Sequence, residues 1–240
     1  DGGDIEFTPI PVKYFLLMSN MMCDVYIRLK KKGEYQYIKR IHKDDNFDNA
    51  TIEKYISQGL TDFYIPKDYK ENFMNFVSNK LVGKLESDKI SVEDKVNVNA
   101  HSFEMATEEI KQMGFTTANV QLAEATIKSM QKVFEKSPKI NSLFNAILSS
   151  KGSYAFQHSQ LTSIICSQIV ENSKWGSEVQ KEKLSFIAFF HDISLAEKPD
   201  LMRIHTEKEL TNAALSEQDK ALVLELALES AKMIQSFPQL

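Results

Sequence analysis

The sequence predicts a small α+β domain over residues 1–86, followed by an all-α helical bundle over residues 87–240. Seven of the eight tyrosines lie between Tyr14 and Tyr69, and aromatic residues favour strands. The whole chain has only 8 glycines and 6 prolines, which favours helices over an all-β fold. Apolar residues recur at helical spacing from about residue 100 onward.

Strand and turn patterns dominate the first domain. Val25, Ile27 and Leu29 alternate with polar residues, which is typical of a half-buried strand, and a Gly-containing turn leads into a partner strand. We expect a short helix at 12–18, a hairpin of strands at 24–29 and 34–41, a helix from Asn49 that Gly59 ends, a strand at 62–65, and a helix capped by Asp68.

The second domain reads as a series of helices. Residues 87–99 are polar and are expected to join the two domains. Helices are expected at 103–113, 117–134, 140–148, 154–170, 181–191 and 216–234.

Charge and composition exclude several classes of protein. The chain has 33 acidic and 29 basic residues and a net charge of −4, so we expect no nucleic acid polymer as a partner. No apolar run approaches the roughly 18–20 residues of a membrane span, and the N-terminus has no signal-peptide pattern. The two cysteines form no CxxC motif and are expected to be reduced. We therefore expect a cytoplasmic protein.

The most informative segment is Phe189-Phe190-His191-Asp192. Leu184, Ile187, Ala188 and His191 share one helical face, so the helix is expected to deliver His191 and Asp192 at its inner end. A buried charge is costly unless it is paired or bound to a metal. Neutral imidazole and carboxylate groups together bind divalent ions.

A second histidine has the same kind of setting. Tyr154, His158, Leu161 and Ile165 share a face of the preceding helix, so His158 is expected to point into the core. The 33-residue spacing from His158 to His191 suffices for two antiparallel helices. Either histidine alone could be a structural core residue, but together with Asp192 they indicate a metal site.

These residues resemble the HD superfamily of metal-dependent phosphohydrolases, and more narrowly its HD-GYP branch. His158-Ser159 resembles the HS pair of that branch, and His191-Asp-Ile-Ser-Leu195 resembles its HDIGK motif. Pro199 and the run Leu215-Ser-Glu-Gln-Asp219 resemble the proline and the L[ST]xEE helix start that follow. The resemblance covers residues 100–240 and, less closely, 1–86.

The resemblance implies an HD-type helical bundle that binds two divalent transition-metal ions, iron or alternatively manganese. Asp192 would bridge the two ions, and His158 and His191 would complete the ligand set of one. It further implies hydrolysis of cyclic di-GMP to pGpG or GMP in bacterial second-messenger signalling, with His191 and Asp192 as the catalytic residues.

The sequence also departs from the family pattern. Leu195 and Ser194 replace the Lys and Gly of HDIGK, Tyr154 replaces the Glu of three-metal members, and Leu226 replaces a later His. Lys198 or His205 is therefore expected to make the phosphate contact. The sequence ends 48 residues after Asp192, so the HHExxDGxGYP part of the family domain is expected to be absent.

Three functions remain open at this point. The first is a cyclic di-GMP phosphodiesterase. The second is a catalytically impaired HD-GYP-like receptor for cyclic dinucleotides or a signalling scaffold, which the changes at Leu195 and Leu226 favour. The third is another HD phosphohydrolase that acts on a nucleotide. The N-terminal domain carries no catalytic constellation and is expected to regulate or dimerise the protein, as a homodimer or with a signalling partner.

Overall fold

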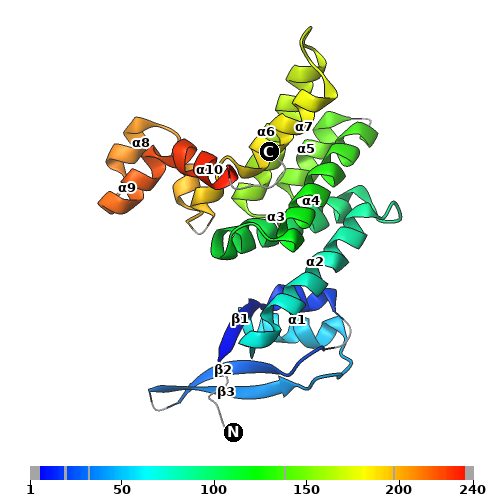
Figure 1. Cartoon of the computed structure of the whole chain (residues 1–240), viewed down its shortest axis with the longest axis vertical. Coiled ribbons are helices and arrows are strands. Elements are labelled where there is room, and N and C mark those ends of the chain that lie inside the picture. The colour runs from blue at the N-terminus through cyan, green and yellow to red at the C-terminus, as the bar shows by residue number, and fades with distance from the viewer. Residues whose placement is uncertain (1–5, 19–20, 32, 138, 197, 236–240) are drawn as a thin grey trace. The chain divides into compact units, whose positions relative to one another are not determined.

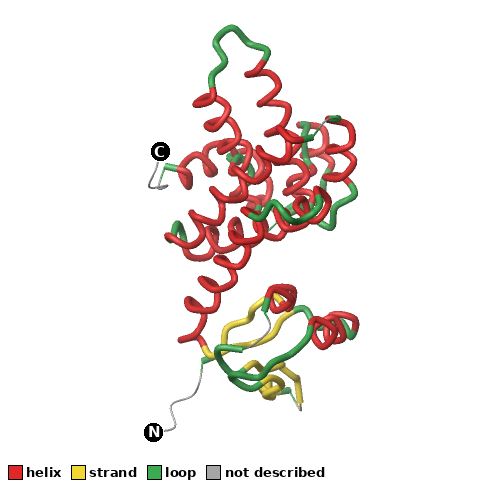
Figure 2. The backbone as a smooth tube through the Cα atoms, turned by 90° about the vertical axis from the view of Figure 1, so that its right-hand side faces the viewer, coloured by secondary structure: helices red, strands yellow, loops and turns green. Residues whose placement is uncertain are grey.

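The computed structural model describes residues 6–18, 21–31, 33–137, 139–196 and 198–235 (Figures 1 and 2). The chain divides into two compact units, Asp1–Leu81 and Val82–Leu240, each of which is described by itself. The first contains the sheet and the second is helical, which confirms the predicted fold class. The division falls inside helix α2 (Lys70–Glu86), a few residues before the predicted limit at 86.

The sheet of the first unit has four antiparallel strands in the order β1-β4-β2-β3. The predicted hairpin forms β2 (Val25–Lys31) and β3 (Glu34–Ile41), and the expected third strand forms β4 (Asp62–Pro66). Strand β1 (Phe7–Pro11) was not predicted, because Pro9 and Pro11 argue against a strand. It pairs only with β4 at an edge of the sheet, where proline is tolerated.

Short helical segments complete the first unit. They are the 3-10 helix η1 (Val12–Leu17), α1 (Asn49–Ser57), the 3-10 helix η2 (Lys67–Tyr69) and the start of α2. Gly59 follows α1 with φ +83°, as its predicted role as helix stop requires. Asp68 lies within η2 instead of capping α2 directly. The fully buried rings of Phe15, Phe63 and Phe73 meet at centroid distances of 4.9 Å in the core.

The second unit is built from helices, as Figure 2 shows. Its elements are α3 (Val92–Met113), α4 (Thr117–Lys136), α5 (Ile140–Leu148), α6 (Tyr154–Glu171), α7 (Glu178–Phe190), the 3-10 helices η3 (Ile193–Leu195) and η4 (Leu201–Arg203), α8 (Glu207–Asn212), α9 (Glu217–Leu224) and α10 (Leu226–Ile234). No helix formed by the described residues is long and apolar enough to span a bilayer.

The expected linker at 87–99 is wrong over most of its length. Helix α3 begins at Val92, and the Ser91 side chain caps it by accepting a hydrogen bond from the Asp94 backbone N–H. The polar composition of this segment does not reflect its burial. Lys95 is buried, and its ammonium donates to the backbone oxygens of Leu85 and Ser87 at 2.5 and 2.6 Å. A buried lysine of this kind follows from tertiary contacts that composition does not reveal.

Two further differences lie near the C-terminal end of the second unit. The predicted helix at 216–234 is two helices, α9 and α10, which meet at Glu225 without a glycine or proline to mark the break. Helix α8 was not predicted, although Thr206 and Glu209 form a capping box at its start. That T-x-x-E pattern is a sequence signal that could have identified the helix.

Candidate metal centre

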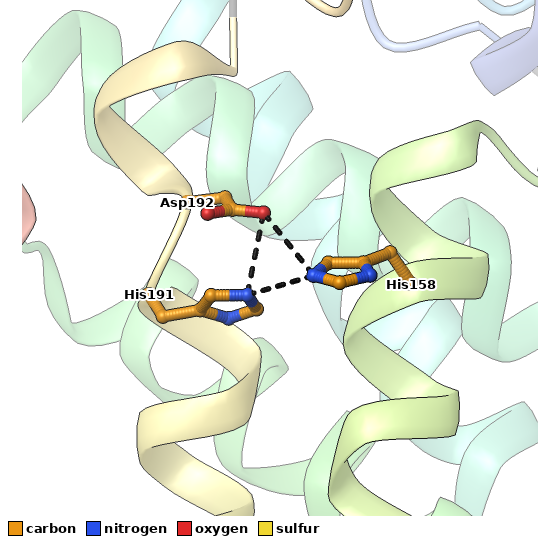
Figure 3. Close-up of side chains that lie close together, drawn as sticks. All are labelled: His158, His191 and Asp192. Atoms are coloured by element: carbon orange, nitrogen blue, oxygen red, sulfur yellow. Dashed lines mark hydrogen bonds and ion pairs between the residues drawn. The ribbon is translucent and has the colours of Figure 1, made fainter. Parts of the chain in front are cut away.

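His158, His191 and Asp192 come together where helices α6 and α7 lie side by side (Figure 3). His158 lies in the second turn of α6, which begins after Ser153. His191 ends α7, and Asp192 follows it directly before η3. The three side chains therefore reach one point from two neighbouring helices, as the 33-residue spacing predicts.

The three side chains approach each other closely through one ligand atom each. The two Nε2 atoms of His158 and His191 lie 3.0 Å apart. Asp192 Oδ2 lies 3.6 Å from His158 Nε2 and 3.3 Å from His191 Nε2. Within the described residues this is the one group of three or more His, Cys, Asp or Glu side chains close enough to hold a single ion.

The trio is partly exposed, so a ligand can reach it. The side chains of His158, His191 and Asp192 are 34%, 30% and 17% accessible. Burial lowers the pKa of His158, because a less hydrated site disfavours the charged imidazolium, and the Asp192 carboxylate only partly opposes this effect. His158 is therefore held toward the neutral form that binds metals.

A backbone carbonyl orients the His191 ring. His191 Nδ1 donates to the oxygen of Ala188 at 2.9 Å. Because a carbonyl can only accept, Nδ1 carries the ring proton and Nε2 presents its lone pair to the trio. Ser159 of α6 donates to the same Ala188 oxygen at 2.5 Å, which joins the two helices at the residue that holds His191.

The donor set fits a cation. Lone pairs of two imidazole nitrogens and a carboxylate oxygen converge on one point, and only a proton or a cation between them relieves their mutual repulsion. Two imidazoles and a carboxylate are also a common ligand set for divalent transition metals. The residues present thus match the metal that the sequence implied.

The predicted inward faces of α6 and α7 are confirmed in part: Ala188 is buried, but each face includes an exposed isoleucine. Ile165 and Ile187, expected on the buried faces, are 51% and 52% exposed. The buried Ser159, next to His158, donates to the carbonyl oxygen of Ala188, which belongs to the predicted face of α7. The trio is partly exposed and does not lie in the interior of the bundle.

His205 lies beside the trio through Tyr154. The Tyr154 ring is nearly parallel to the His158 ring, with an interplanar angle of 9° and centroids 5.8 Å apart. The Tyr154 hydroxyl hydrogen-bonds His205 Nε2 at 3.0 Å, and the His205 and His158 rings are 6.5 Å apart. Tyr154 therefore links the predicted substrate-binding histidine to the predicted metal ligand His158.

Lys198, the other predicted phosphate contact, has a different partner. Its ammonium forms an ion pair with Asp219 in the first turn of α9. Asp219 also accepts a hydrogen bond from the Ser216 hydroxyl at 2.8 Å, and its pKa is lowered chiefly by the Lys198 hydrogen bond. Lys198 is thus tied to the start of α9.

Leu195 and Leu226 belong to one apolar cluster. Leu195 is only 1% exposed and packs with the buried side chains of Leu201 and Met202. Leu226 packs against the same cluster. Both leucines therefore contribute hydrocarbon to the packing of this cluster.

The two cavities described for the protein do not involve the trio. Both lie in the first unit, share Arg40 and Thr51 as lining residues, and have volumes of about 560 and 490 Å³. The candidate metal centre is therefore identified from the convergence of its side chains and not from a cavity.

No family model matches the sequence, and no curated protein matches it. Among solved structures, the fold is similar to that of Bd1817, an HDG"Y"P protein from Bdellovibrio bacteriovorus, with a TM-score of 0.56. The two sequences are 17% identical, and the alignment covers 98% of this chain and 74% of that one. The chain thus has an HD-GYP-like fold, as the sequence predicts.

Proposed function

We propose that the protein is a metal-dependent phosphodiesterase of the HD-GYP type that hydrolyses cyclic di-GMP to pGpG or GMP. The observation that carries the proposal is the convergence of His158, His191 and Asp192 within 4.8 Å of one another. The HD-GYP-like fold supports the same conclusion, because the trio falls on the residues that resemble the family motif.

The ligands of the metal would be the Nε2 atoms of His158 and His191 and the Oδ2 atom of Asp192. A divalent ion there would supply Lewis-acid chemistry at a phosphate and lower the pKa of water. Iron is the preferred candidate, with manganese as the alternative, because two imidazoles and one carboxylate suit both. The Ala188 carbonyl keeps His191 in the tautomer that this role requires.

A second ion would need further ligands. Asp192 has two carboxylate oxygens, of which Oδ2 faces both histidines, so the other oxygen could serve a second ion. We therefore keep two ions as the proposed number, with Asp192 as the bridging ligand.

Substrate contacts are proposed for His205 and Lys198. His205 lies next to the trio and is held by Tyr154, so it needs no rearrangement to approach a phosphate at the metal centre. Lys198 would first have to leave its ion pair with Asp219. His205 is therefore the stronger candidate of the two.

A second function is supported by the apolar cluster. Leu195 and Leu226 contribute hydrocarbon where family members have a lysine and a histidine. The absence of that lysine and that histidine would weaken catalysis more than it weakens binding of the nucleotide. The alternative proposal is accordingly a receptor or scaffold that binds a cyclic dinucleotide without hydrolysing it.

The test combines metal content with product analysis. Protein purified without oxygen and loaded with iron(II) or manganese(II) should release pGpG or GMP from cyclic di-GMP, and His191→Ala should abolish the release. His42→Ala, which alters an exposed histidine of the first unit, is the matched control and should retain activity. Binding without product would favour the receptor, and turnover of other nucleotides alone would favour a different HD phosphohydrolase.

For the N-terminal domain we propose a regulatory or dimerising role. Its described residues contain no group of metal-binding side chains like the trio. Removal of residues 1–86 should then change the mass of the particle in solution or the rate of hydrolysis. Equal subunit number and equal rate in the shortened protein would contradict this role.

A further inference from the structure

An arginine, Arg203, lies beside the candidate metal centre. The guanidinium carbon of Arg203 lies 4.8 Å from the centroid of the Tyr154 ring, within the range of a cation–π contact. Arg203 is exposed, and no Asp or Glu of the described part of the chain pairs with it. Stacking on a ring leaves the N–H groups, which lie in the guanidinium plane, available to an anion.

Tyr154 connects this arginine to the trio. Its ring contacts Arg203 and lies parallel to the His158 ring, while its hydroxyl hydrogen-bonds His205. Arg203 and His205 thus both contact Tyr154. This tyrosine lies one helical turn before His158, a predicted metal ligand.

The segment that carries Arg203 is anchored in the core. Leu201 and Met202, directly before it, are each 6% exposed and belong to the apolar cluster around Leu195. Ile204, directly after it, and Tyr154 pack against that cluster. The backbone that carries the arginine is therefore anchored by buried residues before it and by a partly buried residue after it.

Other cations near the HD segment are already engaged. Lys198 pairs with Asp219, and Lys111 of α3 donates to the backbone oxygen of Ser194 at 3.1 Å. Arg203, in contrast, has a guanidinium that can bind two phosphate oxygens at once.

We propose that Arg203, together with His205, forms an anion subsite that binds the phosphate oxygens of a nucleotide whose reacting phosphate lies at the metal trio. The inference rests on the proposed function, and it assigns to Arg203 the phosphate contact that the lysine missing at position 195 would make. The ligand class is a nucleotide with an anionic phosphodiester or phosphomonoester.

The test uses Arg203→Met and Arg203→Lys in the full-length, metal-loaded protein. Methionine keeps the hydrocarbon stem over Tyr154 but removes the charge. Loss of a charge-assisted hydrogen bond should weaken binding of cyclic di-GMP, measured by calorimetry, and raise KM about 10- to 100-fold. Metal content and the far-ultraviolet CD spectrum should not change. Arg203→Lys should retain part of the affinity for cyclic di-GMP, because lysine keeps the positive charge but cannot donate two parallel hydrogen bonds to one phosphate.

Arg40→Met, the same substitution at an exposed arginine of the first unit, is the matched control and should leave affinity within about twofold of the unmodified protein. Unchanged affinity in Arg203→Met, with cyclic di-GMP bound normally, would overturn the subsite while leaving the phosphodiesterase proposal intact. If the unmodified protein ignores cyclic di-GMP, the proposed function fails, and inorganic phosphate becomes the probe. Weaker phosphate binding in Arg203→Met would then support the subsite, and equal or absent phosphate binding in both proteins would overturn it.

Discussion

Leu195→Lys, which introduces the lysine of the HDIGK motif, should lower the free energy of unfolding of the second unit. Leu195 is 1% exposed among Leu201, Met202 and Leu226. Removing a buried leucine side chain sacrifices about 1.5–3 kcal/mol of transfer free energy. An unpaired ammonium adds a desolvation penalty of several kcal/mol, reduced if the lysine extends its tip to water. We expect the free energy of unfolding to fall by about 3–5 kcal/mol.

Urea unfolding followed by far-ultraviolet CD measures this change, because the second unit is helical. Leu195→Met is the matched control, since it conserves volume and polarity and should cost less than about 1.5 kcal/mol. The midpoint should shift with little change in slope. A loss below about 1 kcal/mol for Leu195→Lys would refute the reasoning, because the side chain could not then lie in a tightly packed apolar cluster.

Three further predictions concern other parts of the chain. Ser159→Ala should weaken metal affinity about tenfold in a metal titration, because it removes a hydrogen bond to the carbonyl that orients His191; unchanged affinity would contradict that role. Gly176→Ala should lower the midpoint of thermal unfolding, because its Cβ would lie 1.9 Å from the Val170 carbonyl oxygen, whereas Gly83→Ala meets no atom within 4 Å and should not lower it. Burial raises the pKa of the Cys23 thiol from 9.0 to about 11, so the folded state holds this proton more tightly than the unfolded state; its stabilising contribution is full below pH 9 and is lost between about pH 9 and 11. Cys23→Ala should flatten the pH dependence of the free energy of unfolding in that window, measured by urea titration, and an unchanged slope would argue against the raised pKa.

Local patterns in the sequence predicted much of the fold. The hairpin follows from alternating apolar residues around the Gly33 turn, and the helix at 140–148 has the predicted limits. Features that depend on distant contacts were missed. Strand β1 exists because an edge position tolerates its prolines, and the start of α3 is buried because Lys95 finds backbone oxygens outside its own helix.

The candidate site shows the same limit. The pairing of His158 with His191 and Asp192 could be predicted, because helical spacing places each histidine near a common point. Their surroundings could not. The exposure of Ile165 and Ile187, and the contact of Arg203 with Tyr154, depend on how α6, α7 and the following segment pack. Periodicity identifies an apolar face but does not reveal which of its residues the neighbouring helices cover.

Metal analysis of anaerobically purified, full-length protein tests the central claim most directly. Elemental analysis should find at least one iron or manganese ion per chain, and Asp192→Ala should lose it while keeping the helical CD spectrum, because the two imidazoles alone leave the ligand set incomplete. The account would be contradicted by a metal-free protein that stays metal-free after incubation with iron(II) or manganese(II), or by equal metal content in Asp192→Ala.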